Sequence, residues 1–311
     1  MKYEVYCVGE MVIDFTPTAE KATYCAHPGG APANVAIAMA RLGRRTAFTG
    51  KVGNDEFGRE LLAALQENHV PMVGSTPCDE ATTTLVFVHL QPDGERTFTF
   101  ARKPGADMFL TPQEIDLDVL AGAEIVHAGS CSLSAGSANA ATKYALRTAH
   151  TLGKHVSFDI NYRPPLWNGN KEKALREVAS VLPYVDFLKL SDEELDFVGG
   201  CDQIPLCMEQ YGISLLVVTL GAQGADAYLR GRKTPIHIDG MKAVVADTNG
   251  AGDAFWSGML SALLTRGDWK LTPDGVMEML RFANVCGWLT VQTYGAIPAF
   301  PRMETVRNYL E

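Results

Sequence analysis

Short apolar runs alternate with longer amphipathic segments along most of the 311 residues. The short runs have the length of strands, whereas the longer segments repeat apolar residues at helical spacing. This order predicts a parallel sheet that is covered by helices on both faces. The predicted strands are residues 3–9, 46–52, 125–128, 155–160, 187–190 and 215–220, and the predicted helices are residues 33–42, 56–68, 137–151, 171–182, 254–264 and 275–291.

Residues 83–101, TTLVFVHLQPDGERTFTFA, break this rhythm. Two alternating runs flank Pro92, Asp93 and Gly94, which predicts an antiparallel hairpin. Together with residues 13–15 and 22–25 the hairpin is expected to form a small separate sheet. This sheet would be built from about residues 12–26 and 83–107 and inserted into a single domain of residues 1–311. A sheet in that position is well placed to act as a lid.

The charge balance limits the classes of partner. A formal net charge of −9 argues against a nucleic-acid or anionic-membrane surface, because there is no basic excess to neutralise phosphates. No apolar stretch approaches the length of a membrane span, and the N-terminal MKYEVYCVGE shows no signal-peptide pattern. The seven scattered cysteines lack paired short spacings and indicate reduced thiols. We therefore expect a cytoplasmic protein.

The segment 247–258, DTNGAGDAFWSG, suggests phosphate chemistry. Gly250, Ala251 and Gly252 lead into Asp253 and an apolar, helix-compatible stretch. The first turn of a helix offers unpaired N–H donors and the positive end of its dipole, and small residues let a phosphate come close. Asp253 would repel a phosphate at this site, so its position makes sense if it takes a proton from the hydroxyl that attacks the phosphate. The alternative is a structural turn in which Asp253 caps the helix.

A second set of residues suits a ligand rich in hydroxyl groups. Residues 27–34, HPGGAPAN, supply Gly30 for close backbone approach and the Asn34 amide as donor and acceptor. Asp14, inside the apolar MVIDF, can accept hydrogen bonds from two vicinal hydroxyls. A sugar site is one interpretation, and a loop that merely begins a helix is the other.

Polar residues follow the predicted strand 155–160, in the segment FDINYRPPLW. Strand periodicity would place Asp159, Asn161 and Arg163 on one face, at the sheet edge where open α/β sheets bind ligands. Arg163 is then a candidate for binding a phosphate or a substrate oxygen. A structural ion pair between Asp159 and Arg163 is the competing interpretation.

Two further strand ends carry weaker signals. Ser191 and Glu194 have the spacing of a capping box, and Glu194 is additionally a candidate for acting through a metal-bound water. Gly221 and Gly224 form a small-residue turn that could approach a nucleotide. The sequence has no GxxxxGK[ST], and it has no N-terminal GxGxxG, which argues against a nicotinamide-dependent oxidoreductase.

Taken together, these segments resemble the ribokinase-like carbohydrate kinases of the PfkB family. The match runs from GEMVIDF and GGAPANVAIAMARLG through GKVGNDEFG to DTNGAGDAFWSG and GAIPAFP. The fragments DGERTFTF, RKPGADM, FDINYRPPLW and LKLSDEEL are most similar to those of fructokinases, particularly bacterial ones. The resemblance implies a three-layer α/β/α sandwich with a small β-sheet lid. It also implies an ATP-dependent kinase for a primary sugar hydroxyl, most similar to enzymes that make fructose 6-phosphate from D-fructose.

The resemblance also implies roles for individual residues. Asp253 would be the general base, and the amides of Gly250, Ala251 and Gly252 would form the anion hole. The implied sugar site is Asp14, Gly30, Asn34, Arg102, Asn161 and Arg163. The implied nucleotide and magnesium contacts are Lys189, Glu194, Thr219, Gly221, Gly224 and Asn284. The implied potassium site is Asp247 and Asn249 with carbonyl groups near Gly295. ATP, Mg²⁺ and K⁺ are thus the expected ligands beside the sugar.

Several alternatives stay open. The family's Asn-x-x-Glu motif appears here as SDEE, with Ser191 in place of asparagine, which leaves open how a magnesium-bound water is held. The acceptor could instead be 2-keto-3-deoxygluconate, a nucleoside or another ketose, and a non-catalytic sugar-sensing paralogue is a further alternative. A homodimer joined through the lids and a monomer both fit the sequence.

Overall fold

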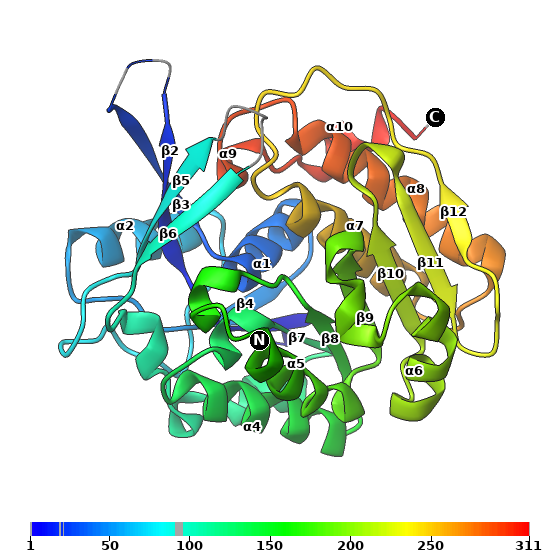
Figure 1. Cartoon of the computed structure of the whole chain (residues 1–311), viewed down its shortest axis with the longest axis horizontal. Coiled ribbons are helices and arrows are strands. Elements are labelled where there is room, and N and C mark those ends of the chain that lie inside the picture. Colours follow the sequence, from blue (N-terminus) through cyan, green and yellow to red (C-terminus); the bar gives the residue numbers. More distant parts are fainter. Residues whose placement is uncertain (1, 19, 21, 91–95, 311) are drawn as a thin grey trace.

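The computed structural model describes residues 2–18, 20, 22–90 and 96–310. A central sheet lies between two layers of helices, and a second sheet stands at its side (Figure 1). The strands are β1 (Val5–Val8), β2 (Val12–Pro17), β3 (Tyr24–Gly29), β4 (Thr46–Thr49), β5 (Leu85–Leu90), β6 (Arg96–Ala101), β7 (Ile125–Gly129), β8 (His155–Asp159), β9 (Phe187–Ser191), β10 (Leu215–Thr219), β11 (Ala225–Leu229) and β12 (Ile236–Ile238). The α-helices are α1 (Ala31–Arg41), α2 (Glu56–Glu67), α3 (Leu117–Gly122), α4 (Ala138–Thr151), α5 (Lys171–Ala179), α6 (Ile204–Tyr211), α7 (Ala251–Arg266), α8 (Pro273–Thr290), α9 (Ala296–Ala299) and α10 (Met303–Arg307).

The central sheet has eight strands within the described residues, in the order β12-β11-β10-β9-β8-β7-β1-β4. The six strands from β10 to β4 are parallel, as the alternation of strands and helices predicts. The edge strands β11 and β12 run antiparallel to their neighbours. These two strands and α6 are not among the predicted elements, because they are short and carry no clear apolar periodicity.

Both faces of the central sheet are buried, and alternate side chains serve opposite faces. Val5 and Cys7 of β1 pack in the core beneath α1, α2, α7 and α8, whereas Tyr6 and Val8 pack in the core beneath α4, α5 and α6. This burial on two faces explains why the predicted strands are continuous apolar runs. Among the helices of the described residues, none is both long and apolar enough to cross a lipid bilayer.

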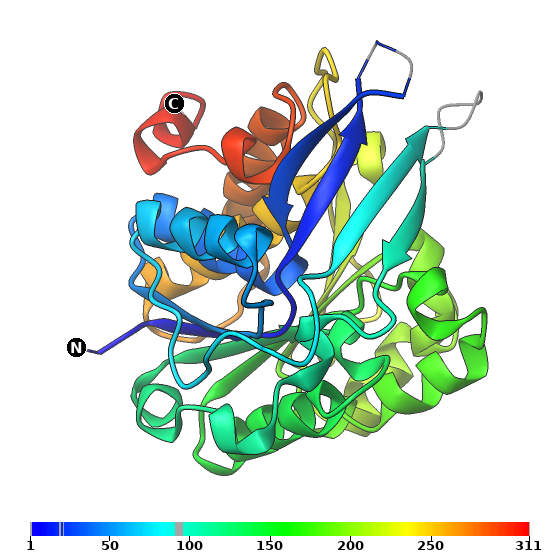
Figure 2. The same cartoon turned by 90° about the vertical axis from the view of Figure 1, so that its left-hand side faces the viewer.

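The four strands outside the central sheet form the second sheet, in the order β3-β2-β5-β6. We call this the lid sheet. It stands above the edge of the main body, with the strands of the two chain segments side by side (Figure 2). Phe15 stacks on Phe87 at a centroid distance of 5.0 Å and meets Phe57 of α2 edge-on at 5.9 Å, which fixes the lid sheet to the body. The hairpin turn predicted at Pro92, Asp93 and Gly94 lies outside the described residues.

Candidate active site

Helix α7 begins at the carboxyl edge of the central sheet with an uncapped first turn. Its N-cap is Gly250, whose φ of 75° lies in the left-handed region that favours glycine, and no side chain caps the helix. By contrast, Asp55 caps α2 by accepting a hydrogen bond from the amide of Gly58. A Cβ atom on Gly250 would lie 2.6 Å from that of Ala296 in α9, so the turn is tightly packed. The first turn of α7 therefore offers N–H donors and a positive dipole end to an anion.

A buried cation lies directly behind this turn. The Nζ of Lys189 in β9 donates to both carboxylate oxygens of Asp159 in β8, at 3.0 and 2.9 Å. A Cβ atom on Gly252 would lie only 3.3 Å from the same nitrogen. Burial opposes the charge, but the Asp159 carboxylate raises the pKa of Lys189, so the amine stays protonated. Its position adds positive potential behind the helix terminus.

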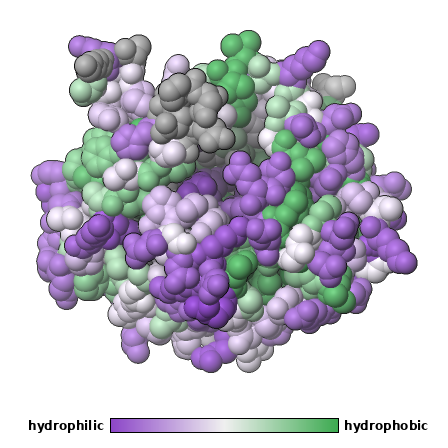
Figure 3. All heavy atoms as spheres, in the orientation of Figure 1, coloured by the Kyte–Doolittle hydropathy of each residue, from purple (hydrophilic) through white to green (hydrophobic). Residues whose placement is uncertain are grey.

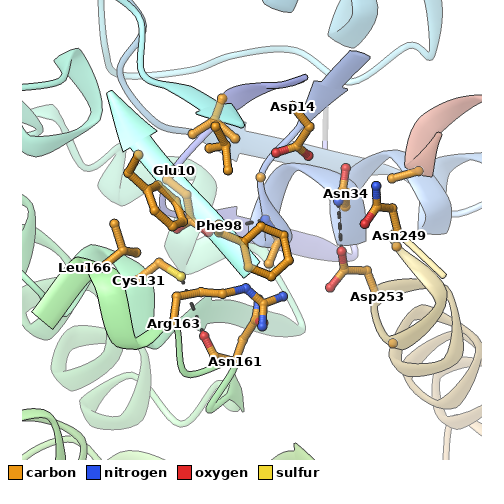
Figure 4. A pocket seen from close by; sticks show the side chains of 18 of the residues that line it. Glu10, Asp14, Asn34, Phe98, Cys131, Asn161, Arg163, Leu166, Asn249 and Asp253 are labelled. Atoms are coloured by element: carbon orange, nitrogen blue, oxygen red, sulfur yellow. Dashed lines mark hydrogen bonds between the residues drawn. The ribbon is translucent and has the colours of Figure 1, made fainter. Parts of the chain in front are cut away.

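Asp253 lies in the first turn of α7 and faces α1 (Figure 4). Its Oδ2 accepts a hydrogen bond of 2.8 Å from Nδ2 of Asn34, so the carboxylate bonds to α1 and does not cap its own helix. The N-cap residue of α7 is Gly250. Burial, followed by the charge of Asp159, raises the pKa of Asp253 to about 6. A carboxylate with a pKa nearer neutrality is better matched to removing a proton from a hydroxyl.

A cavity of about 310 Å³ opens beside Asp253, beneath the lid sheet. We call it the acidic cavity, because five carboxylates line it: Glu10, Asp14, Asp107, Glu194 and Asp253. In the space-filling view the face above it is hollowed near its centre and bordered by hydrophilic side chains (Figure 3). The structure brings all of the predicted sugar-site residues to this cavity, namely Asp14, Gly30, Asn34, Arg102, Asn161 and Arg163.

Asp14 extends from β2 and lies on the same side of the cavity as Asn34 and Asp253 (Figure 4). Gly29 makes room for it, since a Cβ atom there would lie 2.1 Å from Oδ2 of Asp14. Burial raises the pKa of Asp14 to about 7. The positive charge of Arg163 opposes this rise, and the negative charges of Asp253 and Asp247 add to it. A desolvated carboxylate of this kind favours a ligand that supplies hydrogen-bond donors.

The lid sheet turns alternate residues toward the acidic cavity. Val12 and Asp14 come from β2, Val86 from β5, and Phe98 and Phe100 from β6. The sequence interpretation assigns no role to the two aromatic residues. The alternation in RTFTFA, with threonines between the phenylalanines, is the signal that could have identified them.

Arg102 lines the cavity, but its guanidinium group is already engaged. Nε and Nη2 contact Oδ2 of Asp107 at 2.7 and 2.6 Å, and Nη1 donates to the Ser134 hydroxyl at 2.8 Å. Asp107 also accepts a hydrogen bond from Thr84. The guanidinium group therefore joins the end of the lid sheet to the main body and forms part of the cavity wall.

The strand-end residues 159–163 differ from their predicted arrangement. The prediction that they share one face by strand periodicity is wrong, because β8 ends at Asp159 and Asn161 has a φ of 38°. The proposed pair between Asp159 and Arg163 is also wrong, since Asp159 binds Lys189. Arg163 instead places its guanidinium carbon 5.2 Å from the ring centroid of Phe98, which bridges the lid sheet and the body over the cavity.

A second cavity, of about 650 Å³, lies on the other side of the α7 terminus. We call it the apolar cavity, because its walls include Phe255 of α7, Trp288 of α8, Val291 directly after α8 and Val245 from the segment before α7. Trp288 is held by a hydrogen bond of 2.7 Å from Nε1 to the carbonyl of Lys242. The volume lies in the range of small-molecule sites.

Four of the predicted nucleotide residues line the apolar cavity: Thr219, Gly221, Gly224 and Asn284. Asn284 donates from Nδ2 to the Asp239 carbonyl at 2.8 Å, which leaves its side-chain oxygen as the acceptor. Lys189 and Glu194 line the acidic cavity instead. Thr219, Thr248 and Gly252 line both cavities, so the two meet at the uncapped turn of α7.

The predicted metal-binding residues are held by backbone contacts. Glu194 accepts a hydrogen bond of 2.8 Å from the amide of Ser191, which completes the predicted capping box, and another from the amide of Tyr162. The two oxygens of Asp247 accept from the amides of Asn249 and Gly295, each at 2.9 Å. Asp247, Asn249 and Gly295 are thus brought together. The described part of the chain holds no cluster of three or more His, Cys, Asp or Glu side chains arranged for a metal ion.

The sequence matches the profile of the pfkB family of carbohydrate kinases over residues 2–303. Among curated proteins, it is 41% identical to probable fructokinase-4 of Arabidopsis thaliana over 318 residues, which cover 97% of this chain and 95% of the relative. These matches extend over nearly the whole chain, well beyond the motifs.

Solved structures agree with this likeness. The fold superposes on a fructokinase from Xylella fastidiosa with bound ATP, with a TM-score of 0.91, 34% identity and coverage of 99% of this chain and 98% of the other. A fructokinase from Vibrio cholerae, solved with fructose, ADP and a calcium ion, gives a TM-score of 0.90, 33% identity and coverage of 100% and 99%. The fold is therefore of the ribokinase-like α/β type, as expected from the sequence.

Proposed function

The chain belongs to the pfkB family of carbohydrate kinases, and on this premise we propose that it transfers the γ-phosphoryl group of ATP to the 6-hydroxyl of D-fructose. It is a carbohydrate kinase with fructokinase relatives along its whole length. The assignments of acceptor, base and binding residues are our proposal. They rest above all on the position of Asp253, which lines the acidic cavity and directly follows Gly252, where this cavity meets the apolar cavity.

In the proposed reaction, fructose occupies the acidic cavity. Asp14 accepts hydrogen bonds from vicinal ring hydroxyls, and the Asn34 amide holds Asp253 toward the reacting hydroxyl. Asp253 takes the proton as the 6-oxygen attacks the γ-phosphorus, and the phosphorus–oxygen bond to ADP breaks in line. The amides of Gly250, Ala251 and Gly252 stabilise the charge on the transferring group, with Lys189 behind them.

The apolar cavity is the proposed site of the adenosine part of ATP. Its aromatic and aliphatic walls suit a base, and the glycine turn at Gly221 and Gly224 lets the ribose or a phosphate approach the backbone. The phosphates would then extend toward Gly252, one of the residues that both cavities share. This places the γ-phosphoryl group opposite Asp253.

Metal ions are expected to accompany ATP. Mg²⁺, when bound, would neutralise charge on the transferring phosphoryl group, and phosphate oxygens and water would be its main ligands. The carboxylate oxygens of Glu194 at the cavity wall are of the hard type that this ion prefers. The side-chain oxygens of Asp247 and Asn249, which lie near the backbone of Gly295, are of the type that suits K⁺ for the same reason. Both assignments are part of the proposal.

The charges of the acidic cavity favour a neutral acceptor over 2-keto-3-deoxygluconate. Its five carboxylates would repel the carboxylate of that sugar acid. Two of its three basic side chains, Arg102 and Lys189, are held in buried ion pairs with Asp107 and Asp159. A non-catalytic sugar sensor is disfavoured, because Asp253 and the glycine turn are in place. A lid dimer and a cytoplasmic location stay predictions.

A coupled assay of ADP release tests this proposal. The kcat/KM should be highest for D-fructose among fructose, glucose, 2-keto-3-deoxygluconate, ribose and adenosine, each measured with and without potassium. Identification of the product as the 6-phosphate by phosphorus NMR completes the test. A higher kcat/KM for another acceptor would make that compound the proposed substrate in place of fructose. No turnover with any of the acceptors would favour a non-catalytic sugar sensor.

A further inference from the structure

Glu10 lies in the acidic cavity at the point where the chain leaves β1. Its side chain is buried, with an exposed fraction of only 7%. It lies across the cavity from Asp253, on the side of Phe98 and Leu166 (Figure 4). No feature of the sequence assigns it a role, because a single glutamate after a strand is a weak signal.

The two oxygens of Glu10 are in different situations. Oε1 accepts a hydrogen bond of 3.2 Å from the amide of Ala31, the first residue of α1, where the N-cap Gly30 offers no side chain. Oε2 is buried and has no hydrogen-bond partner among the described residues. A buried carboxylate oxygen without a donor costs free energy, so native structures rarely leave one in this state.

A second buried oxygen, Oδ1 of Asn34, also lacks a hydrogen-bond partner among the described residues. Nδ2 of the same side chain donates to Asp253. Both oxygens belong to residues that line the acidic cavity near the start of α1. Two unpartnered acceptors in one cavity call for a ligand with several donors, which a polyol supplies.

The neighbours of Glu10 do not supply these donors. Asp107 is bound by Arg102 and Thr84, and Arg102 is further bound to Ser134. Burial, together with the charge of Asp107, raises the pKa of Glu10 to about 7, although the charge of Arg102 and the hydrogen bond from the Ala31 amide oppose this rise. Near neutral pH both protonation states are present, and each can bond to a hydroxyl, which both donates and accepts.

We infer that Glu10 is a further sugar-binding residue, whose Oε2 holds a hydroxyl at the C1–C2 end of fructose while Oε1 holds the start of α1. This rests on the proposed function, since it takes the 6-hydroxyl to lie at Asp253. A furanose ring with C6 at one side of the cavity turns C1 and C2 to the opposite side, where Glu10 lies. Glu10 thereby selects for a ketose.

Two analogues test this inference, since each lacks one hydroxyl of that end. 1-Deoxy-D-fructose lacks the C1 hydroxyl, 2,5-anhydro-D-mannitol lacks the C2 hydroxyl, and both keep the acceptor hydroxyl. The kcat/KM for fructose and for both analogues is measured with the unmodified protein, Glu10→Gln and Glu10→Ala. Asp55→Ala is the control, because it removes a carboxylate cap from α2, away from both cavities.

The expected result is a selective loss. Glu10→Ala should lower the kcat/KM for fructose by about 10- to 100-fold, and the value for one of the analogues by less than about threefold. Glu10→Gln should lower the kcat/KM for fructose by less than Glu10→Ala does, because the glutamine amide can still form a hydrogen bond with a hydroxyl. Asp55→Ala should leave the ratio between fructose and the analogues unchanged.

If Glu10→Ala lowered the kcat/KM equally for fructose and both analogues, or lowered none of them, the inference would be overturned. Glu10 would then only support the start of α1. The proposed function would survive that result, since the unmodified protein would still phosphorylate fructose. Failure of the unmodified protein to phosphorylate fructose would overturn both. If Glu10→Ala does not fold, the same ratios measured with Glu10→Gln decide.

Discussion

The acidic and apolar cavities meet at Gly252, yet their linings follow opposite physical rules. Carboxylates line the first, and burial raises the pKa of Asp14 and Asp253 above the ordinary range. Side chains such as Phe255 and Trp288 line the second, and the polar groups of Asn284 and Trp288 donate hydrogen bonds to backbone carbonyls. The first suits a neutral ligand with many donors, and the second suits a flat, largely apolar ligand. The uncapped turn of α7 is placed between them.

The largest expected effect comes from the point where the cavities meet. Asp253→Asn keeps the size of the side chain but removes the base, so kcat should fall by about two to four orders of magnitude, with little change in the KM for fructose or ATP. The measurement is the steady-state rate of ADP release with both substrates varied.

Asp274→Asn is the matched control, since Asp274 is an exposed aspartate in the first turn of α8. It should retain the full rate. Turnover of Asp253→Asn near that of the control would remove Asp253 from the chemistry.

The next effect belongs to the acidic cavity alone. Asp14→Asn replaces a charged acceptor of hydrogen bonds with a neutral amide, so the KM for fructose should rise by about 10- to 100-fold. The KM for ATP should stay within about twofold, because Asp14 does not line the apolar cavity. Equal changes in both values would mean that the cavities do not act separately.

The same variant should be more stable than the unmodified protein at pH 8. The pKa of Asp14 is raised from 3.8 to about 7 in the folded protein, so its ionisation destabilises the fold as the pH rises through this range. Above about pH 7 asparagine avoids that cost, and near pH 4 the advantage disappears. Thermal unfolding at pH 8 and pH 5 checks this, and a Tm gain that is larger at pH 5 contradicts it.

A smaller effect is expected from the apolar cavity. Trp288→Ala removes an aromatic wall, and the KM for ATP should rise about tenfold, the scale of the loss of one aromatic stacking contact with a base. The KM for fructose should not change. Kinetics with ATP varied at saturating fructose measure this, and an unchanged KM for ATP would place the base elsewhere.

The smallest effect is on the pH dependence. Asp253 acts as the ionised form, and its pKa is raised to about 6, so activity is lost as the pH falls through that value. The kcat/KM for fructose, which reports the free enzyme, should fall about twofold between pH 7 and pH 6 from this ionisation, and Trp288→Ala should show the same profile. A flat profile down to pH 5 contradicts this role of Asp253.

The sequence predicts the fold well where local periodicity controls it. The buried parallel strands and the amphipathic helices carry their pattern in consecutive residues, and the second sheet has the alternation of a solvent-facing hairpin. The edge strands β11 and β12 escape prediction, because these short antiparallel strands depend on pairing with their neighbours, β11 with β10 and β12 with β11, more than on their own residues.

The candidate site is predictable to the extent that its residues lie in glycine-rich motifs or stand out as polar residues within apolar runs. Asp14, Asn34 and Asp253 could be named in advance, although only the fold brings them together. The pairing of Lys189 with Asp159 could not, since it joins neighbouring strands 30 residues apart. The left-handed Asn161 breaks the periodicity that the prediction for Arg163 assumed. Glu10 lies in the segment GEMVIDF, but nothing in that segment gives it a role, and the inference about it depends on one buried oxygen that only the structure reveals.

The most direct test of two cavities for two substrates is a crossed binding measurement by calorimetry. Fructose and a non-hydrolysable ATP analogue are each titrated into Asp14→Asn and Trp288→Ala. We predict that Asp14→Asn weakens the binding of fructose by at least about tenfold and changes the affinity for the ATP analogue by no more than about twofold. Trp288→Ala should do the reverse. Equal weakening of both ligands by either variant would contradict it.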